Sequence, residues 1–110
     1  MFHFDTGLNE ADTMKEAITR GKAYLDAGAT TVFYWGGSGR GLRTAWGETL
    51  VRELNGRVAV KLAHGTADAL STAELARIGV ARISVGPSLF LVAQAAVKKA
   101  AASILSGGNL

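Results

Sequence analysis

Residues 25–37, LDAGATTVFYWGG, and residues 75–87, LARIGVARISVGP, repeat one local pattern. Each reads as the end of a helix, a glycine, a small residue, a strand rich in β-branched or aromatic side chains, and a further glycine. The two glycines that follow the helices, Gly28 and Gly79, are 51 residues apart. This is the span of two βα units, so the echo predicts a chain built from repeated strand–helix pairs.

The rest of the chain completes this pattern. An apolar stripe of helical period favours a helix over residues 8–28, begun by a capping box of Thr13 and Glu16. Ser71 and Glu74 repeat that spacing before a short helix that Gly79 ends. We therefore expect four βα units with parallel strands in one domain of residues 1–110. The expected strands are 2–6, 30–35, 58–63 and 81–85, and the other expected helices are 44–54, 71–78 and 88–105.

Composition and charge narrow the function classes. The chain has 110 residues, of which 48% are hydrophobic and 19% charged, as in a folded globular domain. It contains no cysteine, which removes disulfide and thiolate chemistry and favours a cytoplasmic protein. No charged region precedes an apolar stretch at the start, so we expect no secretion leader. We expect no apolar run to span a membrane, and the net charge of +3 is dispersed. Neither a membrane nor a nucleic acid is therefore expected as a partner.

Four βα units raise a packing problem. A closed (βα)8 TIM barrel needs eight strands, so four units make half of one, with helices on the outer face, an uncovered inner face and two unpaired edges. Two copies would solve this by pairing as a barrel-like homodimer. Alternatively, the helices would move to both faces of a flatter, flavodoxin-like open sheet. We favour the homodimer.

Two stretches carry a family resemblance. EAITRGKAYLDAGA at residues 16–29 and AELARIGVARISVGP at residues 73–87, with the strand VAVKLA between them, resemble the isocitrate lyase/phosphoenolpyruvate mutase family. The likeness covers about residues 10–105 and implies the C-terminal half of that family's barrel, strands five to eight. The family makes or breaks C–C or P–C bonds next to a carboxylate on 2-oxo or hydroxy acids, which implies a lyase or phosphonomutase ancestry.

The chain also departs from this family. The family's essential Mg²⁺ is held by acidic residues after the third and fourth strands, and their counterparts are absent here, so we expect no cofactor in this chain. The family's fifth strand ends Arg-Thr-Asp, where the arginine binds the substrate's anionic group. Here the triplet is His3-Phe4-Asp5, and only Asp5 matches. With the unusual Tyr34, Trp46 and Gly47, this exchange favours an engineered sequence.

Candidate site residues lie where strands are expected to end, because parallel βα architectures place their chemistry there. Asp5 is carried over from the family as a substrate-binding residue. His64 ends the third expected strand and, paired with Asp5, would act as a general base, although a structural role is the alternative. Lys61 precedes it within the strand and needs a carboxylate partner if it points into a barrel.

The glycine-rich loop GGSGRGLR, residues 36–43, is a second candidate site. Backbone N–H groups at Gly36 and Gly37, together with Arg40 and Arg43, would bind a phosphate or carboxylate anion. The loop lacks the Gly-Lys-Ser/Thr ending of a Walker motif, and a flexible βα loop is the alternative.

Three functions remain open at this point. The chain is a self-associating half-barrel without catalysis of its own, or it retains Mg²⁺-dependent lyase or mutase activity as an oligomer or after joining a missing half. The third possibility is a weak phosphate-binding module that uses the glycine-rich loop. We favour the first, with packing as the role of the aromatic residues.

Overall fold

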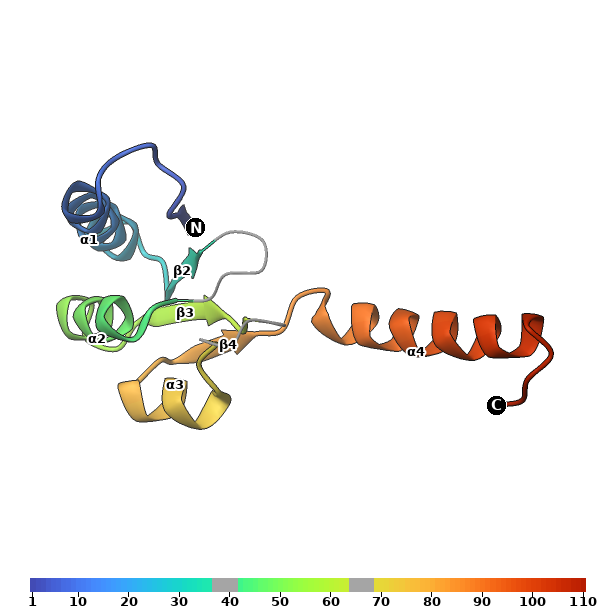
Figure 1. The fold of residues 1–110 in the computed structure, drawn as a ribbon. Coiled ribbons are helices and arrows are strands. Elements are labelled where there is room, and N and C mark those ends of the chain that lie inside the picture. The colour runs from blue at the N-terminus through green and yellow to red at the C-terminus, as the bar shows by residue number, and fades with distance from the viewer. Residues whose placement is uncertain (37–41, 64–68) are drawn as a thin grey trace.

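The computed structural model describes residues 1–36, 42–63 and 69–110. Strand and helix alternate along this part of the chain, as the sequence pattern predicts (Figure 1). The elements are β1 (Phe2–His3), α1 (Glu10–Asp26), β2 (Val32–Trp35), α2 (Thr44–Glu53), β3 (Val58–Lys61), α3 (Thr72–Ile78), β4 (Arg82–Ser84) and α4 (Ser88–Leu105). All strands are shorter than expected, and the helices agree closely with expectation.

The strands of the described residues form one parallel sheet in the order β1-β2-β3-β4. Its register pairs Tyr34 with Phe2 on one side and with Val60 on the other. The helices α1, α2 and α3 lie on the same side of the sheet (Figure 1). The predicted α/β architecture of parallel βα units is confirmed, whereas the flavodoxin-like alternative, which needs helices on both faces, is not what the structure shows.

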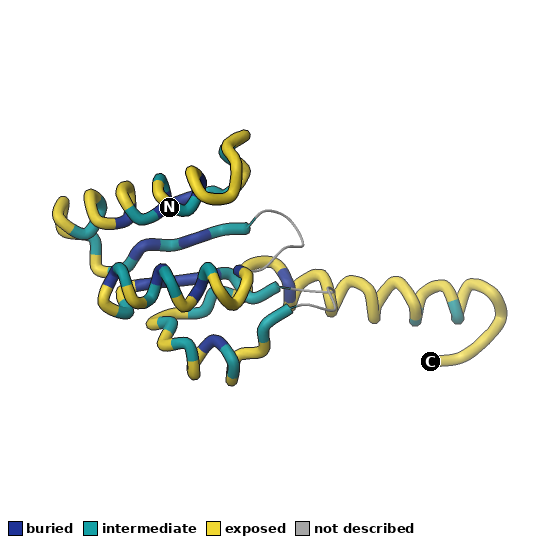
Figure 2. Tube along the Cα trace, turned by 60° about the vertical axis from the view of Figure 1, so that its left-hand side comes forward, coloured by how far each residue is buried: buried dark blue, intermediate teal, exposed yellow. Residues whose placement is uncertain are grey.

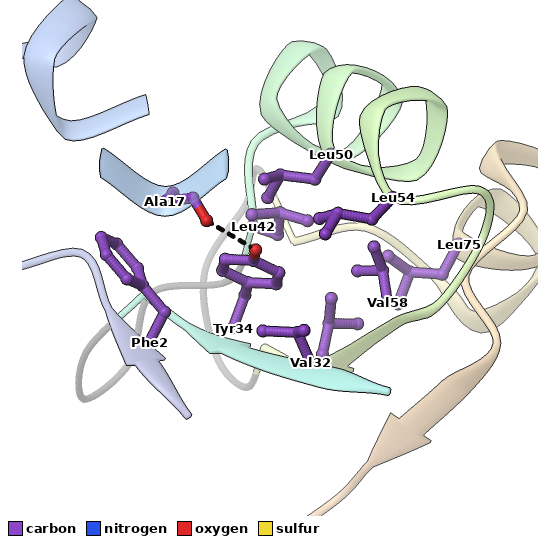
Figure 3. Packing of buried hydrophobic residues seen from close by; sticks show 10 residues of the cluster. Phe2, Ala17, Val32, Tyr34, Leu42, Leu50, Leu54, Val58 and Leu75 are labelled. Carbon is purple, nitrogen blue, oxygen red and sulfur yellow. Dashed lines mark hydrogen bonds between the residues drawn. The ribbon is translucent and has the colours of Figure 1, made fainter. Parts of the chain in front are cut away.

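The core fills the space between one face of the sheet and these three helices. Because side chains alternate along a strand, every second residue points toward the helices. Figure 3 shows Val32 and Val58 extending from the strands toward Leu50, Leu54 and Leu75, whereas Phe2 and Tyr34 extend toward Ala17 of α1. The core residues include Phe2, Ala17, Val32, Tyr34, Leu42, Leu50, Leu54, Val58, Val60 and Leu75, each at most 6% exposed.

The start of α1 differs from its expectation. Asn9, not Thr13, is the N-cap, and its side-chain oxygen accepts a hydrogen bond from the Asp12 N–H at 2.9 Å. Thr13 lies inside the first turn, buried, with its hydroxyl 2.8 Å from that of Thr6. Asn9 and Thr13 are both residue types that favour the N-cap position. The Thr13 hydroxyl contacts Thr6 instead of capping the helix.

The ends of α3 confirm their predictions. The Ser71 hydroxyl accepts a hydrogen bond from the Glu74 N–H, and the Glu74 carboxylate accepts one from the Ser71 N–H at 2.8 Å, which completes the capping box. Gly79 follows the helix in the left-handed region with φ +96°. Local sequence therefore defines this helix at both ends.

The last helix, α4, departs most from expectation. It extends away from the sheet, and almost all of its residues are exposed (Figures 1 and 2). The chain measures 59 × 27 × 24 Å and has a radius of gyration of 17.6 Å, against roughly 13 Å for a compact domain of this length. The expectation that all four helices cover the outer face is therefore wrong for α4. Within the described sheet β4 is an edge strand, so α4 has no groove between two strands to pack into.

Hydropathy makes α4 unusual in a second way. It has 18 residues with a mean hydropathy of 1.4, which is long and apolar enough to cross a membrane by length and composition alone. The expectation that the chain holds no such stretch is therefore wrong. Lys98 and Lys99 lie within the helix, so both lysines would have to enter the apolar layer of the membrane if α4 spanned it.

Candidate functional site

The strands are parallel, so their C-terminal ends all lie at one end of the sheet. Asp5 and Gly36 follow β1 and β2 at this end. Gly37, Arg40 and His64, which the sequence also places near this edge, lie outside the described residues. The proposed pairing of Asp5 with His64 therefore stays a prediction, as does the anion cradle of Gly36, Gly37 and Arg40.

Asp5 is exposed and lies two residues beyond the last strand position of β1. Its backbone N–H donates a hydrogen bond to Nδ1 of His3 at 3.1 Å. This bond turns the chain at the strand end and leaves the carboxylate facing solvent. His3 in turn meets Trp35 edge to face, with ring centroids 4.8 Å apart.

A shallow cavity of about 420 Å³ lies next to β1 and includes His3 and Asp5 in its lining. Glu16 and Arg20 also line it, and their side chains form an ion pair with a separation of 2.6 Å. The Arg20 guanidinium lies 6.0 Å from the Phe2 ring centroid. Since this arginine is paired with Glu16 on its own helix, a bound anion would compete with a carboxylate that is already present.

Arg43, the other described member of the glycine-rich candidate site, is the residue before α2. Its guanidinium donates a hydrogen bond to Oε1 of Glu10 at 2.9 Å and lies 5.2 Å from the ring centroid of Trp46. The same Glu10 oxygen accepts a hydrogen bond from Trp46 Nε1 at 2.9 Å. Glu10 therefore ties the start of α1 to the start of α2, and it uses the charge that Arg43 was expected to offer an anion.

The aromatic residues divide between the two faces of the sheet. Phe4 packs between Tyr34 and Trp46, with centroid distances of 5.8 and 4.6 Å, on the side of the helices. Tyr34 is 1% exposed, and its hydroxyl donates to the Ala17 carbonyl at 2.8 Å. Burial raises the pKa of this tyrosine well above its ordinary value, so the hydroxyl stays protonated. Packing is confirmed as the role of Phe2, Phe4 and Tyr34.

Trp35 lies on the opposite face, and its Nε1 is buried without a hydrogen-bond partner among the described residues. This face also carries Lys61, whose register partner is Ser84 of β4. The position of Lys61 within an expected strand already singled out this side chain. Nothing in it could show that Glu10 and Arg43, 33 residues apart, would meet, because that contact depends on how two helices pack.

A metal site needs several ligand side chains that converge on one point. In residues 1–36, 42–63 and 69–110, no three His, Asp or Glu side chains converge as a metal site requires. These residues therefore offer no cluster of three such ligands to the Mg²⁺ that the family resemblance implies, and the absence of a cofactor stays a prediction.

The family described as phosphoenolpyruvate phosphomutase matches residues 2–105, nearly the whole chain. The chain belongs to the phosphoenolpyruvate phosphomutase family. The resemblance to this family is thereby confirmed, whereas the placement as half of a barrel stays a prediction.

Two solved structures from Burkholderia cenocepacia J2315 support the same conclusion. One, assigned as a lyase/mutase, has a TM-score of 0.69 and 32% identity over 83% of this chain and 31% of its own. The other, assigned as a phosphonomutase, has a TM-score of 0.67 and 34% identity over 94% of this chain and 37% of its own. The chain thus spans about a third of the length of these structures. No curated protein matches the chain significantly.

Proposed function

We propose that this chain is a half-barrel of the phosphoenolpyruvate phosphomutase family that has no catalysis of its own and acts by self-association through α4. The observation that carries this proposal is the exposure of that helix. Leu89, Phe90 and Val97 are 69%, 63% and 63% exposed, and Leu105 is 87% exposed. Apolar surface of this extent on a single helix favours contact with another protein surface.

The apolar side chains of α4 follow a pattern that fits a helical partner. Phe90, Val97 and Ile104 are seven residues apart, with Ala93 and Ala100 at the intermediate positions of the same face. This spacing forms one continuous seam along a helix, where a second helix packs side chain against side chain. A second copy of the chain supplies an identical seam, which favours a symmetric dimer.

The oligomeric mass tests this proposal. We expect light scattering after gel filtration to give a dimer for the parent chain and a monomer for Phe90→Glu/Val97→Glu, because two carboxylates in the seam oppose its burial. Ala95→Glu/Ala102→Glu is the matched control, since it adds the same charge on the opposite face of α4 and should leave the dimer intact. A parent chain that is monomeric, or that only binds phospholipid vesicles, would overturn the proposal.

A second candidate, residual lyase or mutase activity in an oligomer or after joining a missing half, is favoured by the family match and by the names of the two solved structures. Its test is Mg²⁺-dependent turnover of a phosphonate or carboxylate 2-oxo acid, with Asp5→Asn and heat-unfolded protein as controls. A rate that Asp5→Asn removes would support catalysis. A rate equal to that of the unfolded chain would exclude it.

The anion-binding module is a weaker candidate. Arg43 already pairs with Glu10, and Gly37 and Arg40 lie outside the described residues. Titration with inorganic phosphate, followed by the fluorescence of Trp46, tests it. A signal that Arg40→Ala/Arg43→Ala abolishes would revive the candidate.

A further inference from the structure

The turn between α2 and β3 contains the pair Asn55-Gly56. Among the asparagines of the chain, only Asn55 precedes a glycine; the other two, Asn9 and Asn109, precede larger residues. An asparagine side chain reacts with the backbone nitrogen of the following residue when the two meet. Glycine leaves that nitrogen unshielded, because it has no Cβ, and gives the backbone the freedom to approach. Asn55 is therefore the asparagine whose neighbour most favours this reaction.

The reaction is an intramolecular deamidation whose only co-reactant is water. The backbone nitrogen of Gly56 loses its proton to solvent and attacks Cγ of Asn55, and the new C–N bond closes a succinimide ring. The side-chain nitrogen takes up a proton and leaves as ammonia. Water then opens the ring at either carbonyl carbon. Breaking the bond from the nitrogen to Cγ gives aspartate, whereas breaking the original peptide bond gives isoaspartate, in which the main chain runs through the side chain.

The folded turn holds the reacting nitrogen back. Asn55 has a φ of +51°, in the left-handed region that asparagine tolerates better than most residues. The Gly56 N–H donates a hydrogen bond to the Val51 carbonyl at 2.8 Å, the bond that closes a Schellman motif at the end of α2. Asn55 is exposed, so water reaches its amide. The attack therefore requires that the Gly56 bond break and the backbone rotate, and not that the side chain be uncovered.

Arg57, the residue after the reactive pair, restrains the same turn. Its Nε donates a hydrogen bond to the Thr30 carbonyl at 2.9 Å, and its guanidinium also donates to the Ala29 carbonyl. Its own backbone carbonyl accepts a hydrogen bond from the Val32 N–H at 2.9 Å, where β2 and β3 begin to pair. These bonds fix the turn against the chain between α1 and β2, so they oppose the opening that the reaction requires.

We infer that Asn55-Gly56 is a site of spontaneous deamidation, that opening of the α2–β3 turn sets its rate, and that the product destabilises the fold. Isoaspartate adds a methylene to the main chain inside a turn whose length the bonds of Gly56 and Arg57 fix. Both products also place a carboxylate just after the C-terminal end of α2, where the helix dipole disfavours negative charge. The inference does not depend on how copies of the chain associate.

Peptide mapping of aged protein tests the site. The chain is incubated at mildly alkaline pH, folded or in urea, and trypsin then releases residues 53–57, whose three forms are separated by chromatography against synthetic standards. We expect aspartate and isoaspartate at position 55, formed about tenfold or more slowly in the folded chain than in urea. Asn9 and Asn109 in the same digest should stay largely unchanged. Equal rates in both states would overturn the role of the turn, and no conversion of Asn55 in urea would overturn the site.

Variants separate opening of the turn from other causes. Arg57→Gln should speed the reaction of the folded chain and leave the rate in urea unchanged, whereas Lys98→Gln, the same loss of charge on α4, should change neither rate. A parental rate in folded Arg57→Gln would contradict control by the turn. If Arg57→Gln does not fold, the parent chain in graded urea carries the test, because its rate should rise before circular dichroism reports unfolding; a rise only with unfolding would contradict local opening.

The effect of the product has its own control. Asn55→Gly keeps a residue that adopts the left-handed conformation and removes the reactive amide. After equal incubation, the converted fraction of the parent chain, isolated by ion exchange, should melt at a lower temperature than fresh protein, and Asn55→Gly should keep its Tm. A converted fraction with the Tm of fresh protein would overturn the destabilising effect.

Discussion

Each of the four helices follows a parallel strand of the same sheet. The helices α1, α2 and α3 pack on this sheet, whereas α4 extends away from it. The first three cover one face of the sheet and enclose side chains such as Leu50 at 0% exposure and Leu75 at 2%. The fourth is the longest and most apolar, and its leucines, valines and phenylalanine are mostly exposed (Figure 2). A helix is therefore not buried because it is apolar; it is buried where neighbouring strands provide a surface for it.

The largest effect should come from truncating a leucine on each side of this comparison. Leu50→Ala removes a fully buried side chain between α2 and the sheet and should lower the free energy of unfolding by about 3 kcal/mol. Leu89→Ala, the control on α4, should cost about 0.5 kcal/mol or less, because Leu89 is 69% exposed. Urea unfolding at low protein concentration measures both. Equal losses would show that α4 packs on the body in solution.

Glycine within a helix sharpens the comparison further. Gly21→Ala in α1 should destabilise the chain by about 2 kcal/mol, because the new Cβ would collide with the Tyr34 hydroxyl and lie 2.9 Å from Cδ2 of Leu54. Helix propensity alone predicts the opposite sign, a gain of about 1 kcal/mol. Thermal unfolding decides the sign, with Ala96→Gly in the exposed α4 as the control governed by propensity. A more stable Gly21→Ala variant would contradict the close contact of α1 with β2.

Removing the hydroxyl of Tyr34 should lower the free energy of unfolding by less than Leu50→Ala does. Tyr34→Phe leaves the Ala17 carbonyl without its buried donor and should cost about 1–2 kcal/mol. Tyr24→Phe is the control, since Tyr24 makes no side-chain hydrogen bond within the described residues and is partly buried in the same region. Urea midpoints compare the two, and equal midpoints would contradict a stabilising bond from Tyr34.

The smallest effect concerns helix ends and depends on pH. Hydrogen bonds from the Ser71 backbone and side chain lower the pKa of Glu74 below its ordinary value of 4.5. The stability from this capping box is therefore complete above pH 4.5 and is lost as the pH falls through the lowered pKa. Glu74→Gln should reduce the acid sensitivity of unfolding, and Glu48→Gln, an exposed control, should not. α4 has no side-chain N-cap bond, so its helicity should lack this acid-sensitive contribution.

The pKa of Glu53 is also lowered, in this case by Lys22. Its ammonium lies 3.1 Å from the Glu53 carboxylate and lowers the pKa of that glutamate. This pair joins α1 to α2, and it should therefore add to the acid sensitivity of the body rather than to that of α4. Circular dichroism across the acid range should show a smaller loss of helical signal for Lys22→Gln than for the parent chain. The helix α4, which this ion pair does not join, should be unaffected.

The candidate site was less predictable than the fold. Sequence placed Arg43 next to a glycine-rich loop and suggested an anion, whereas packing placed Glu10 against it. Asp5 follows the end of β1, as expected, and is exposed, while its expected pairing with His64 stays a prediction. Such contacts depend on side chains that are distant in sequence, so no local pattern could reveal them.

The sequence by itself determined the order of strands and helices, the ends of α3 and the family, because capping residues, glycines and alternating side chains act over a few positions. Only the tertiary structure decided which face each strand residue takes, how Tyr34 and Gly21 meet, and that α4 leaves the body. These depend on which surfaces are available to pack against. The described chain offers α4 none beyond its edge strand, however apolar the helix is.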